Sequence, residues 1–257
     1  MKRCAHFLIL AGGILMASQS RADNLLQWQD NSLTYLNGTD FKVDPPRQQT
    51  VTFEHASSWS FGDLFVFVDV IKFNTQASNA AGDGRSYYGE VSPRLSFSKM
   101  TGTDLSFGPI KDVLLAATYE FGEDDSESYL LGPAIDLNIP GFDYFQLNTY
   151  YRETDGKRDG SGVWQITPVW SYTIPVGNSD LLIDGFMDWV VDNDQNYHAN
   201  LHFNPQIKYD LAKGLGLGKK FYVGIDYDYW SDKYGIRDGQ VLATNQSAVS
   251  LLLKAHF

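Results

Sequence analysis

The stretch YHANLHFNPQIKY, residues 197–209, alternates along its length between apolar and polar side chains. The apolar set is Tyr197, Ala199, Leu201, Phe203, Pro205, Ile207 and Tyr209, and the polar set is His198, Asn200, His202, Asn204, Gln206 and Lys208. Because successive side chains of a strand point to opposite faces, the alternation predicts a β-strand with one apolar and one wet face. Its length and its terminal tyrosines are typical of a bilayer-crossing strand, although strands of soluble sandwiches also alternate.

The same alternation recurs along the chain and predicts about twelve strands. The expected strands cover residues 31–37, 49–56, 63–73, 87–98, 112–121, 129–138, 144–152, 164–172, 181–191, 197–209, 221–230 and 246–257. Segments rich in Gly, Pro, Asn and Asp separate them and predict loops, including a turn-rich connector at 99–111 and a Gly/Lys turn at 211–220. This regular series favours an all-β protein with a single domain.

The last expected strand presents a continuous apolar face made of Val249, Leu251, Leu253, Ala255 and Phe257. Pairing of this strand with the first would close a barrel and leave no free edge. An even strand number puts both termini on one side, and the short connectors 57–62, 139–142 and 175–179 are typical of periplasmic turns. We therefore predict a single antiparallel transmembrane β-barrel with both termini periplasmic. A terminal phenylalanine on this pattern resembles the signal that the barrel assembly machinery of bacterial outer membranes recognises.

The N-terminus predicts export. Residues 1–22 combine a basic start, a short apolar run and a small-residue end, as a cleaved secretory signal peptide does, which leaves residues 23–257 as the barrel. Cleavage removes three of the 20 basic residues and no acid, so the net charge changes from −11 to −14. This acidity disfavours nucleic acid as a partner. An aromatic content of 14% with no later apolar run of about 18 residues favours a barrel in outer-membrane lipid.

Metal, cofactor and enzyme interpretations find little support in the sequence. His198 and His202 share a face but lie roughly 13 Å apart along a strand, too far for one ion, so hydrogen bonding in the lumen is expected. Residues 192–196 begin like a calcium loop but lack its glycine and its closing glutamate. A lipid hydrolase or acyltransferase would need a nucleophile beside a histidine at the lipid surface, and no serine is recognisably spaced from His55. We predict neither a cofactor nor an enzyme.

One segment carries a family resemblance. EVSPRLSFSK at residues 90–99 followed by TGTDLSFGPIK at residues 101–111 resembles the signature of the nucleoside-specific channel-forming porins. The resemblance implies a twelve-stranded barrel with a narrow, nucleoside-conducting lumen, and use of the protein by phages as a surface receptor. The expected function is passive uptake of nucleosides or similar small solutes across the outer membrane. A non-conducting or general-diffusion barrel that acts as a receptor or adhesin is the alternative.

The alternation of side chains between the two faces of each strand indicates which residues face the lumen. Two phenylalanines share a strand face with two aspartates, so all four are expected to point away from lipid, where the rings could stack on nucleobases. Polar residues on later strands could hydrogen-bond ribose and base edges. The full set of expected substrate-binding residues is Asp63, Phe65, Phe67, Asp69, Glu90, Arg94, Asn148 and Arg152. Two alternatives stay open: the charges could form a structural ion-pair lattice, or the parity could be reversed and place the phenylalanines in the aromatic girdle.

Overall fold

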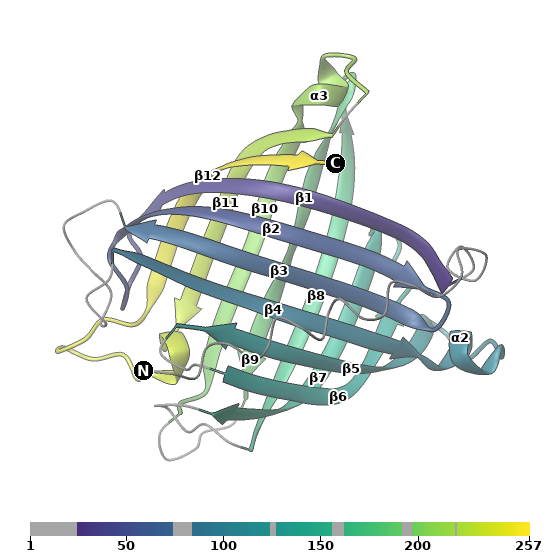
Figure 1. The fold of residues 1–257 in the computed structure, drawn as a ribbon, viewed down its shortest axis with the longest axis horizontal. Coiled ribbons are helices and arrows are strands. Elements are labelled where there is room, and N and C mark those ends of the chain that lie inside the picture. The colour runs from purple at the N-terminus through teal and green to yellow at the C-terminus, as the bar shows by residue number, and fades with distance from the viewer. Residues whose placement is uncertain (1–24, 74–83, 124–126, 156–161, 192–196, 219) are drawn as a thin grey trace, which may run out of the picture.

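A computed structural model describes residues 25–73, 84–123, 127–155, 162–191, 197–218 and 220–257. In these residues twelve antiparallel strands form one closed barrel, in which each strand pairs with its sequence neighbours and β1 pairs with β12 (Figure 1). The predicted all-β barrel and its strand number are confirmed. The predicted signal peptide, residues 1–22, lies outside the described residues.

Nine of the twelve strands are longer than the sequence pattern indicated, β4 has the expected length, and β10 and β12 are shorter. They are β1 Leu26–Thr39, β2 Arg47–Trp59, β3 Gly62–Phe73, β4 Arg85–Ser96, β5 Ile110–Gly122, β6 Glu127–Leu137, β7 Tyr144–Asp155, β8 Val163–Val176, β9 Ser179–Val190, β10 Asn200–Asp210, β11 Phe221–Ser231 and β12 Gln246–His256. The short helices are α2 Phe97–Thr101, α3 Leu211–Gly214 and the 3-10 turn η1 Lys233–Gly235. No helix in the described ranges has the length and apolar character needed to cross a membrane.

The closing seam between β1 and β12 follows the predicted alternation. Thr34 pairs with Lys254 and Leu36 with Leu252 on the inner face, where Leu252 is 1% exposed. The outer residues of β12 are apolar, and Leu251 is 68% exposed. With this seam closed, no strand edge is left for water or another chain to pair with.

The interior is polar, which reverses the usual distribution of a soluble domain. The buried side chains include Arg94, Asn148, Gln165 and Lys208, whereas large apolar side chains are exposed on the outside. Water is absent from a bilayer core, so an apolar outer face and internally paired backbone groups are what a spanning barrel requires.

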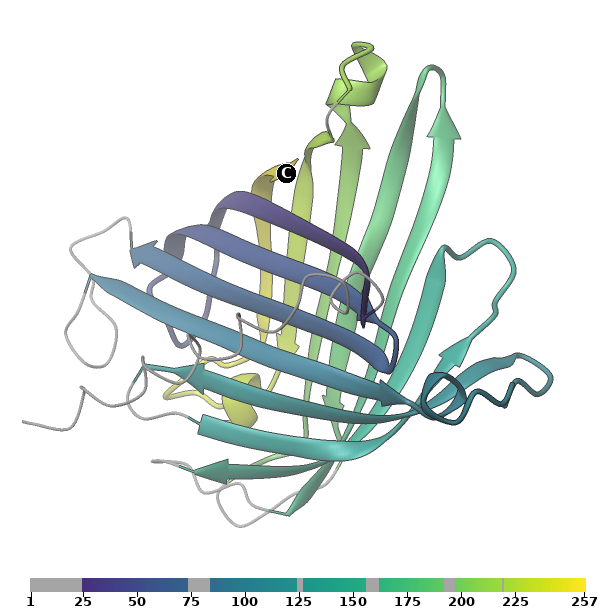
Figure 2. The same ribbon diagram turned by 45° about the vertical axis from the view of Figure 1, so that its right-hand side comes forward.

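The two ends of the barrel differ. At one, the turn end, β2–β3, β6–β7 and β8–β9 are joined by short turns, and the connections β4–β5 and β10–β11 contain α2 and α3 (Figure 2). β1 begins and β12 ends at this same end. At the other, the loop end, β3 and β4 are joined by residues 74–84, and β11 and β12 by residues 232–245. Assignment of the turn end to the periplasm stays a prediction.

Aromatic side chains gather near both ends on the outer face. Tyr119 stacks on Tyr129 with ring centroids 5.2 Å apart near the loop end, and Trp59 lies 6.0 Å from Phe61 at the turn end. Amphipathic rings in two bands are typical of the two membrane–water interfaces.

Three local predictions are wrong. β10 begins at Asn200, not at Tyr197, because the backbone at residues 197–199 does not pair with β9 or β11 and His198 N donates instead to Gly235 O at 2.9 Å. Tyr197 is therefore 8% exposed rather than at the lipid interface. The fourth strand ends at Ser96, not at Ser98, because α2 begins at Phe97, and the connector 211–220 contains all of α3 instead of a turn alone. Each helix begins where a polar side chain caps it, Ser96 and Asp210 respectively.

Candidate functional site

All eight predicted site residues lie on the inner face of β3, β4 and β7. Asp63 is opposite Arg94, Phe65 opposite Ser92, Phe67 opposite Glu90 and Asp69 opposite Tyr88. Directly paired residues of neighbouring strands share a face, so the phenylalanines line the lumen with the charged groups. The structure places seven of the eight in two arginine clusters and an aromatic row, and Asp69 lies apart from these groups.

Arg94 is the centre of the first cluster, with 5% of its side chain exposed. Its Nε and Nη2 donate to the two carboxylate oxygens of Asp63 at 2.8 and 2.7 Å, and Nη1 donates to Asp136 at 2.8 Å. Nη1 also lies 3.5 Å from Asn148 Oδ1. A planar guanidinium thus joins β3, β4, β6 and β7 with its donors directed at acids.

Arg152 forms the second cluster. Its two terminal nitrogens donate to both carboxylate oxygens of Glu120 at 2.5 Å each. They also reach Gln165 at 3.1 Å and Ser128 at 3.0 Å, and the guanidinium carbon lies 6.0 Å from the centre of the Tyr197 ring. This cluster joins strands β5 to β8 and the loop before β10.

The aromatic row lies beside these clusters. The rings of Phe65 and Phe67 are 6.0 Å apart and tilted by 39°, and Phe67 lies 5.8 Å from Tyr88. The Tyr88 hydroxyl donates to Glu90 at 2.8 Å. Phe65 is 38% exposed although it points inward, so its ring surface is open to the lumen. The flat apolar faces of these rings, in an otherwise polar lumen, are available for stacking on a solute.

The opposite side of the lumen is rich in acids. Lys254 lies 2.6 Å from Glu54, and Lys208 lies 2.7 Å from Asp184. Asp69, at the boundary of this side on β3, accepts from the Thr52 hydroxyl at 2.5 Å rather than from a cation. The alternation in the sequence indicates that these side chains point inward, because each lies on the polar face of its strand. It does not indicate which of them form ion pairs with one another.

A second aromatic group lies between β9 and β11. The His202 ring stacks on Trp230 with centroids 3.9 Å apart and an angle of 12°, and Phe186 meets it edge-on at 5.0 Å. His202 Nε2 lies 3.2 Å from Asp228. The expected lumen position of His202 is confirmed, and its ring makes a close contact with a carboxylate and a stack on an indole. Within the described ranges, no cluster of three His, Cys, Asp or Glu residues has the arrangement to hold a metal ion.

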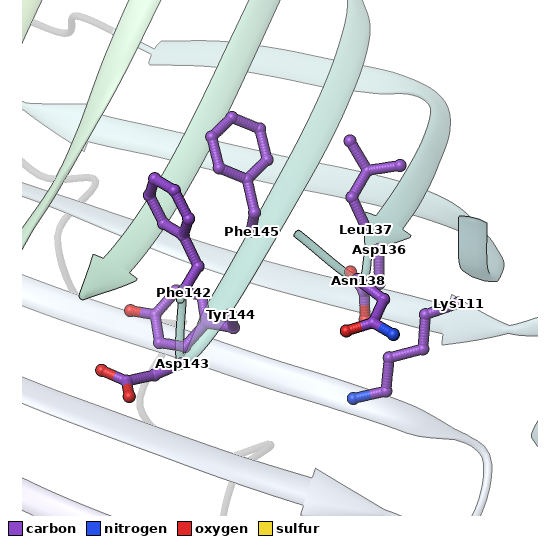
Figure 3. A pocket seen from close by; sticks show the side chains of 8 residues that line it. All are labelled: Lys111, Asp136, Leu137, Asn138, Phe142, Asp143, Tyr144 and Phe145. Carbon is purple, nitrogen blue, oxygen red and sulfur yellow. The ribbon is translucent and has the colours of Figure 1, made fainter. Parts of the chain in front are cut away.

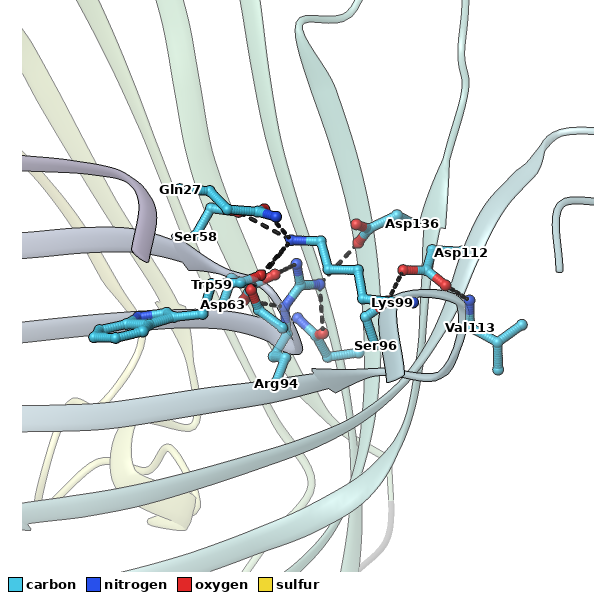
Figure 4. Close-up of polar contacts among 12 residues, drawn as sticks. Gln27, Ser58, Trp59, Asp63, Arg94, Ser96, Lys99, Asp112, Val113 and Asp136 are labelled. Carbon is cyan, nitrogen blue, oxygen red and sulfur yellow. Dashed lines mark hydrogen bonds and ion pairs between the residues drawn. The ribbon is translucent and has the colours of Figure 1, made fainter. Parts of the chain in front are cut away.

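The signature segment holds the turn end together (Figure 4). Ser96 Oγ donates to Asp112 at 2.5 Å and accepts from Lys99 N at 3.0 Å. The Lys99 ammonium donates to the carbonyl oxygens of Trp59 and Gly62 at 2.9 and 3.3 Å. Together with Arg94, these residues connect β4 to β3 and β5. The signature residues therefore stabilise the barrel structure as well as contributing to the lumen surface.

A small cavity of about 60 Å³ lies at the turn-end mouth. Its lining residues are Lys111, Asp136, Leu137, Asn138, Phe142, Asp143, Tyr144 and Phe145 (Figure 3). Phe142 and Phe145 point away from Lys111 and Asp143 in the close-up. A volume of this size holds a few water molecules, so the candidate site for a larger solute is the lumen itself.

Comparison with known proteins gives a consistent result. The family described as nucleoside-specific channel-forming protein, Tsx, matches residues 23–256. Outer membrane protein OmpK of Vibrio parahaemolyticus is 25% identical over 183 residues, which are 68% of this chain and 66% of that protein. Nucleoside-specific channel-forming protein Tsx of Salmonella typhimurium is 28% identical over 137 residues, 48% of each chain. The alignments thus span just under two thirds of OmpK and about half of Tsx.

Among solved structures, a KdgM porin matches with a TM-score of 0.49 and 10% identity, over 88% of this chain and 99% of that one. The outer membrane protein Omp33 of Acinetobacter baumannii matches with a TM-score of 0.41 and 9% identity, over 91% and 99% of the two chains.

Proposed function

Since the chain belongs to the family of nucleoside-specific channel-forming proteins, and is an outer-membrane barrel, we propose that it conducts nucleosides passively through its lumen. The observation that carries the proposal is the pair of lumen-facing rings, Phe65 and Phe67, beside a wall of paired charges. The function is transport alone, without a chemical step.

The aromatic row supplies the contact for the nucleobase. Stacking of a base on an aromatic side chain contributes on the order of 1–3 kcal/mol. Phe65, Phe67 and Tyr88 form a row of successive rings 5.8 to 6.0 Å apart, so a base can pass from one ring to the next. Several modest sites suit a channel better than one tight site, because the solute must also leave.

The polar residues of the site supply hydrogen bonds. Ribose hydroxyls can donate to carboxylates, and Asp69 and Glu90 lie on the lumen face of the strands that carry the aromatic row. Asp63, Arg94, Asn148 and Arg152 sit in the adjoining clusters, where Arg94 and Asn148 are buried. In the proposal Arg94 and Arg152 hold Asp63 and Glu120 in the wall, while Asp69 and Glu90, which accept from hydroxyl groups instead, face the sugar.

The direction of transport follows from the ends of the barrel. Short turns are typical of the periplasmic side of outer-membrane barrels and long loops of the cell surface. We assign the turn end, with the start of β1 and the end of β12, to the periplasm. Solutes then enter past the loop end and leave past the cavity at Asp143.

The double substitution Phe65→Ala with Phe67→Ala tests the proposal in proteoliposomes. Loss of stacking is expected to reduce uridine flux at low concentration by roughly tenfold, as the loss of about 1.4 kcal/mol implies, while small-ion conductance stays the same or rises. The control is Val66→Ala, a substitution on the outer face of the same strand, which is expected to leave uridine flux unchanged.

Three outcomes contradict the proposal. If the double substitution changes uridine and arabinose flux together, the rings do not recognise a base. If uridine and arabinose cross the unmodified protein at equal rates, the barrel is a general-diffusion pore. Absence of any conductance in planar bilayers would instead support a receptor or adhesin barrel.

A further inference from the structure

The connection between β4 and β5 is the most unusual part of the turn end. Residues 97–109, here called the α2 hairpin, comprise α2 and the turn that follows it. The hairpin extends past the ends of β4 and β5, well apart from α3 on the same rim (Figures 1 and 2). It contains most of the signature segment, and the proposed transport gives it no role.

The α2 hairpin exposes its apolar side chains instead of packing them. Phe107 is 80% exposed, Met100 56%, Phe97 40% and Leu105 38%, and α2 buries none of its residues. Four exposed large apolar side chains in thirteen consecutive residues are unfavourable in water. Such a surface indicates contact with something apolar.

The backbone of the hairpin satisfies many of its own polar groups. Gly102 N donates to Ser98 O at 2.9 Å, and Thr101 Oγ1 donates to Phe97 O at 2.7 Å. Phe107 and Ile110 exchange two backbone hydrogen bonds of 2.9 Å. A segment that pairs its polar groups internally tolerates surroundings with little water, because it leaves fewer donors and acceptors to hydrate.

The hairpin is continuous with the lipid-facing surface. Phe97 directly follows the outward row of β4 that ends at Leu95, which is 37% exposed. The four acceptors of the Lys99 ammonium, on β1, β2 and the start of β3, fix the base of the hairpin beside the Trp59–Phe61 pair. The apolar band of the barrel therefore extends onto the hairpin.

We propose that the α2 hairpin lies in the lipid headgroup region of the leaflet at the turn end and inserts Met100 and Phe107 at the boundary with the acyl chains. Asp104, in the same hairpin, limits the depth. The hydrogen bond from Ser106 N at 2.9 Å lowers the pKa of this carboxyl, so it stays charged and remains among the headgroups. A short apolar segment with a charged edge suits this interfacial position.

The experiment uses single cysteines in the full chain. Cys4 is the one cysteine of the sequence and lies in the predicted signal peptide, and Cys4→Ser keeps the background free of cysteine even in uncleaved protein. Phe107→Cys and Met100→Cys are each labelled with an environment-sensitive fluorophore and reconstituted in vesicles of phosphatidylcholine and phosphatidylglycerol. Some vesicles carry lipids with a doxyl quencher near the headgroup, and others carry the quencher deep in the acyl chain.

Two control positions bracket the result. Leu251→Cys on the outer face of β12 reports the acyl region. Val241→Cys reports water, because Val241 is an apolar residue that is fully exposed, like Phe107, but lies in the β11–β12 connection at the loop end. We expect Phe107→Cys and Met100→Cys to emit at shorter wavelength than Val241→Cys and to be quenched most strongly by the shallow quencher.

Emission and quenching equal to those of Val241→Cys at both hairpin positions would overturn the proposal and leave a water-exposed surface. Stronger quenching by the deep quencher would overturn the headgroup placement. If either Phe107→Cys or Met100→Cys fails to assemble, the emission and quenching of the other variant still test the proposal. The pair Met100→Ser and Phe107→Ser is expected to shift a label at Leu105→Cys toward the water-like emission without changing uridine flux, which separates this inference from the transport proposal.

Discussion

The two sides of the lumen carry similar residue types but balance their charges differently. On β4 to β8, the arginine wall, Arg94 binds two aspartates and Arg152 binds both oxygens of Glu120. On β9 to β12 with β1 and β2, the acidic wall, two lysines face a larger number of acids. In the described part of the chain, Asp226 accepts hydrogen bonds from the side-chain amides of Asn204 and Gln206 and has no salt bridge.

This difference assigns a physical task to each wall. A guanidinium is planar and offers several donors in fixed directions, so it holds acids on different strands rigidly. An ammonium is a point charge that fixes less geometry. The arginine wall therefore sets the shape of the bore, and the acid excess of the opposite wall sets its field. β3, which lies between the two walls, carries Phe65 and Phe67, and β9, at the edge of the acidic wall, carries Phe186.

The largest effect is expected from breaking the arginine wall. Arg94→Met leaves Asp63 and Asp136 partly buried without their cation, which costs roughly 3–5 kcal/mol in the free energy of unfolding. The measurement is urea unfolding in lipid vesicles, followed by tryptophan fluorescence. Lys254→Met is the matched substitution in the acidic wall and removes the partner of Glu54 alone, so a smaller loss is expected. Equal losses would show that the walls do not differ in rigidity.

The second effect concerns ion selectivity. The acid excess predicts that potassium passes more readily than chloride, and Asp226→Asn with Asp228→Asn should reduce this preference. Two charges 4 Å apart interact by about 1 kcal/mol in water and less at larger distance, so the permeability ratio should fall roughly twofold per charge. The reversal potential in a potassium chloride gradient measures it. Asp180→Asn, at the start of β9 near the turn end, is the control. An unchanged permeability ratio in the double variant would show that the acidic wall does not set the ion selectivity.

The smallest effect concerns the loop end. Thr244 N and Asn245 N donate to Asp238 at 2.7 and 3.1 Å, which lowers the pKa of this exposed carboxyl. A group with a lowered folded-state pKa stabilises the fold above its unfolded pKa, and this contribution is lost as the pH falls through the folded value. A spin label at Val241→Cys should therefore become more mobile below about pH 4. Asp238→Asn should abolish the pH dependence, and mobility that rises on alkalinisation would contradict the sign.

Much of this architecture follows from alternation along each strand. Parity places Phe65, Phe67 and Arg94 on the inner face without knowledge of their neighbours, because the side-chain period of a strand is fixed. Which charges meet depends on strand stagger and tilt, so the pairing of Arg94 with Asp136, 42 residues away, could not be predicted. Tyr197 shows a different limit: its alternation continues into a loop that tertiary contacts fold inward.

The position of the Arg94 side chain depends on the small residues next to it. Ala116 is opposite Arg94 on β5 and Gly132 is opposite Ala116 on β6, and neither residue has a side chain that extends beyond Cβ. The arginine can therefore lie flat against the wall as it reaches β6. A bulkier residue at Ala116 would push the guanidinium of Arg94 toward the barrel axis. The lumen would then be narrower at this level. The diameter of the lumen can thus change with the volume of a single side chain, while the number of strands stays at twelve.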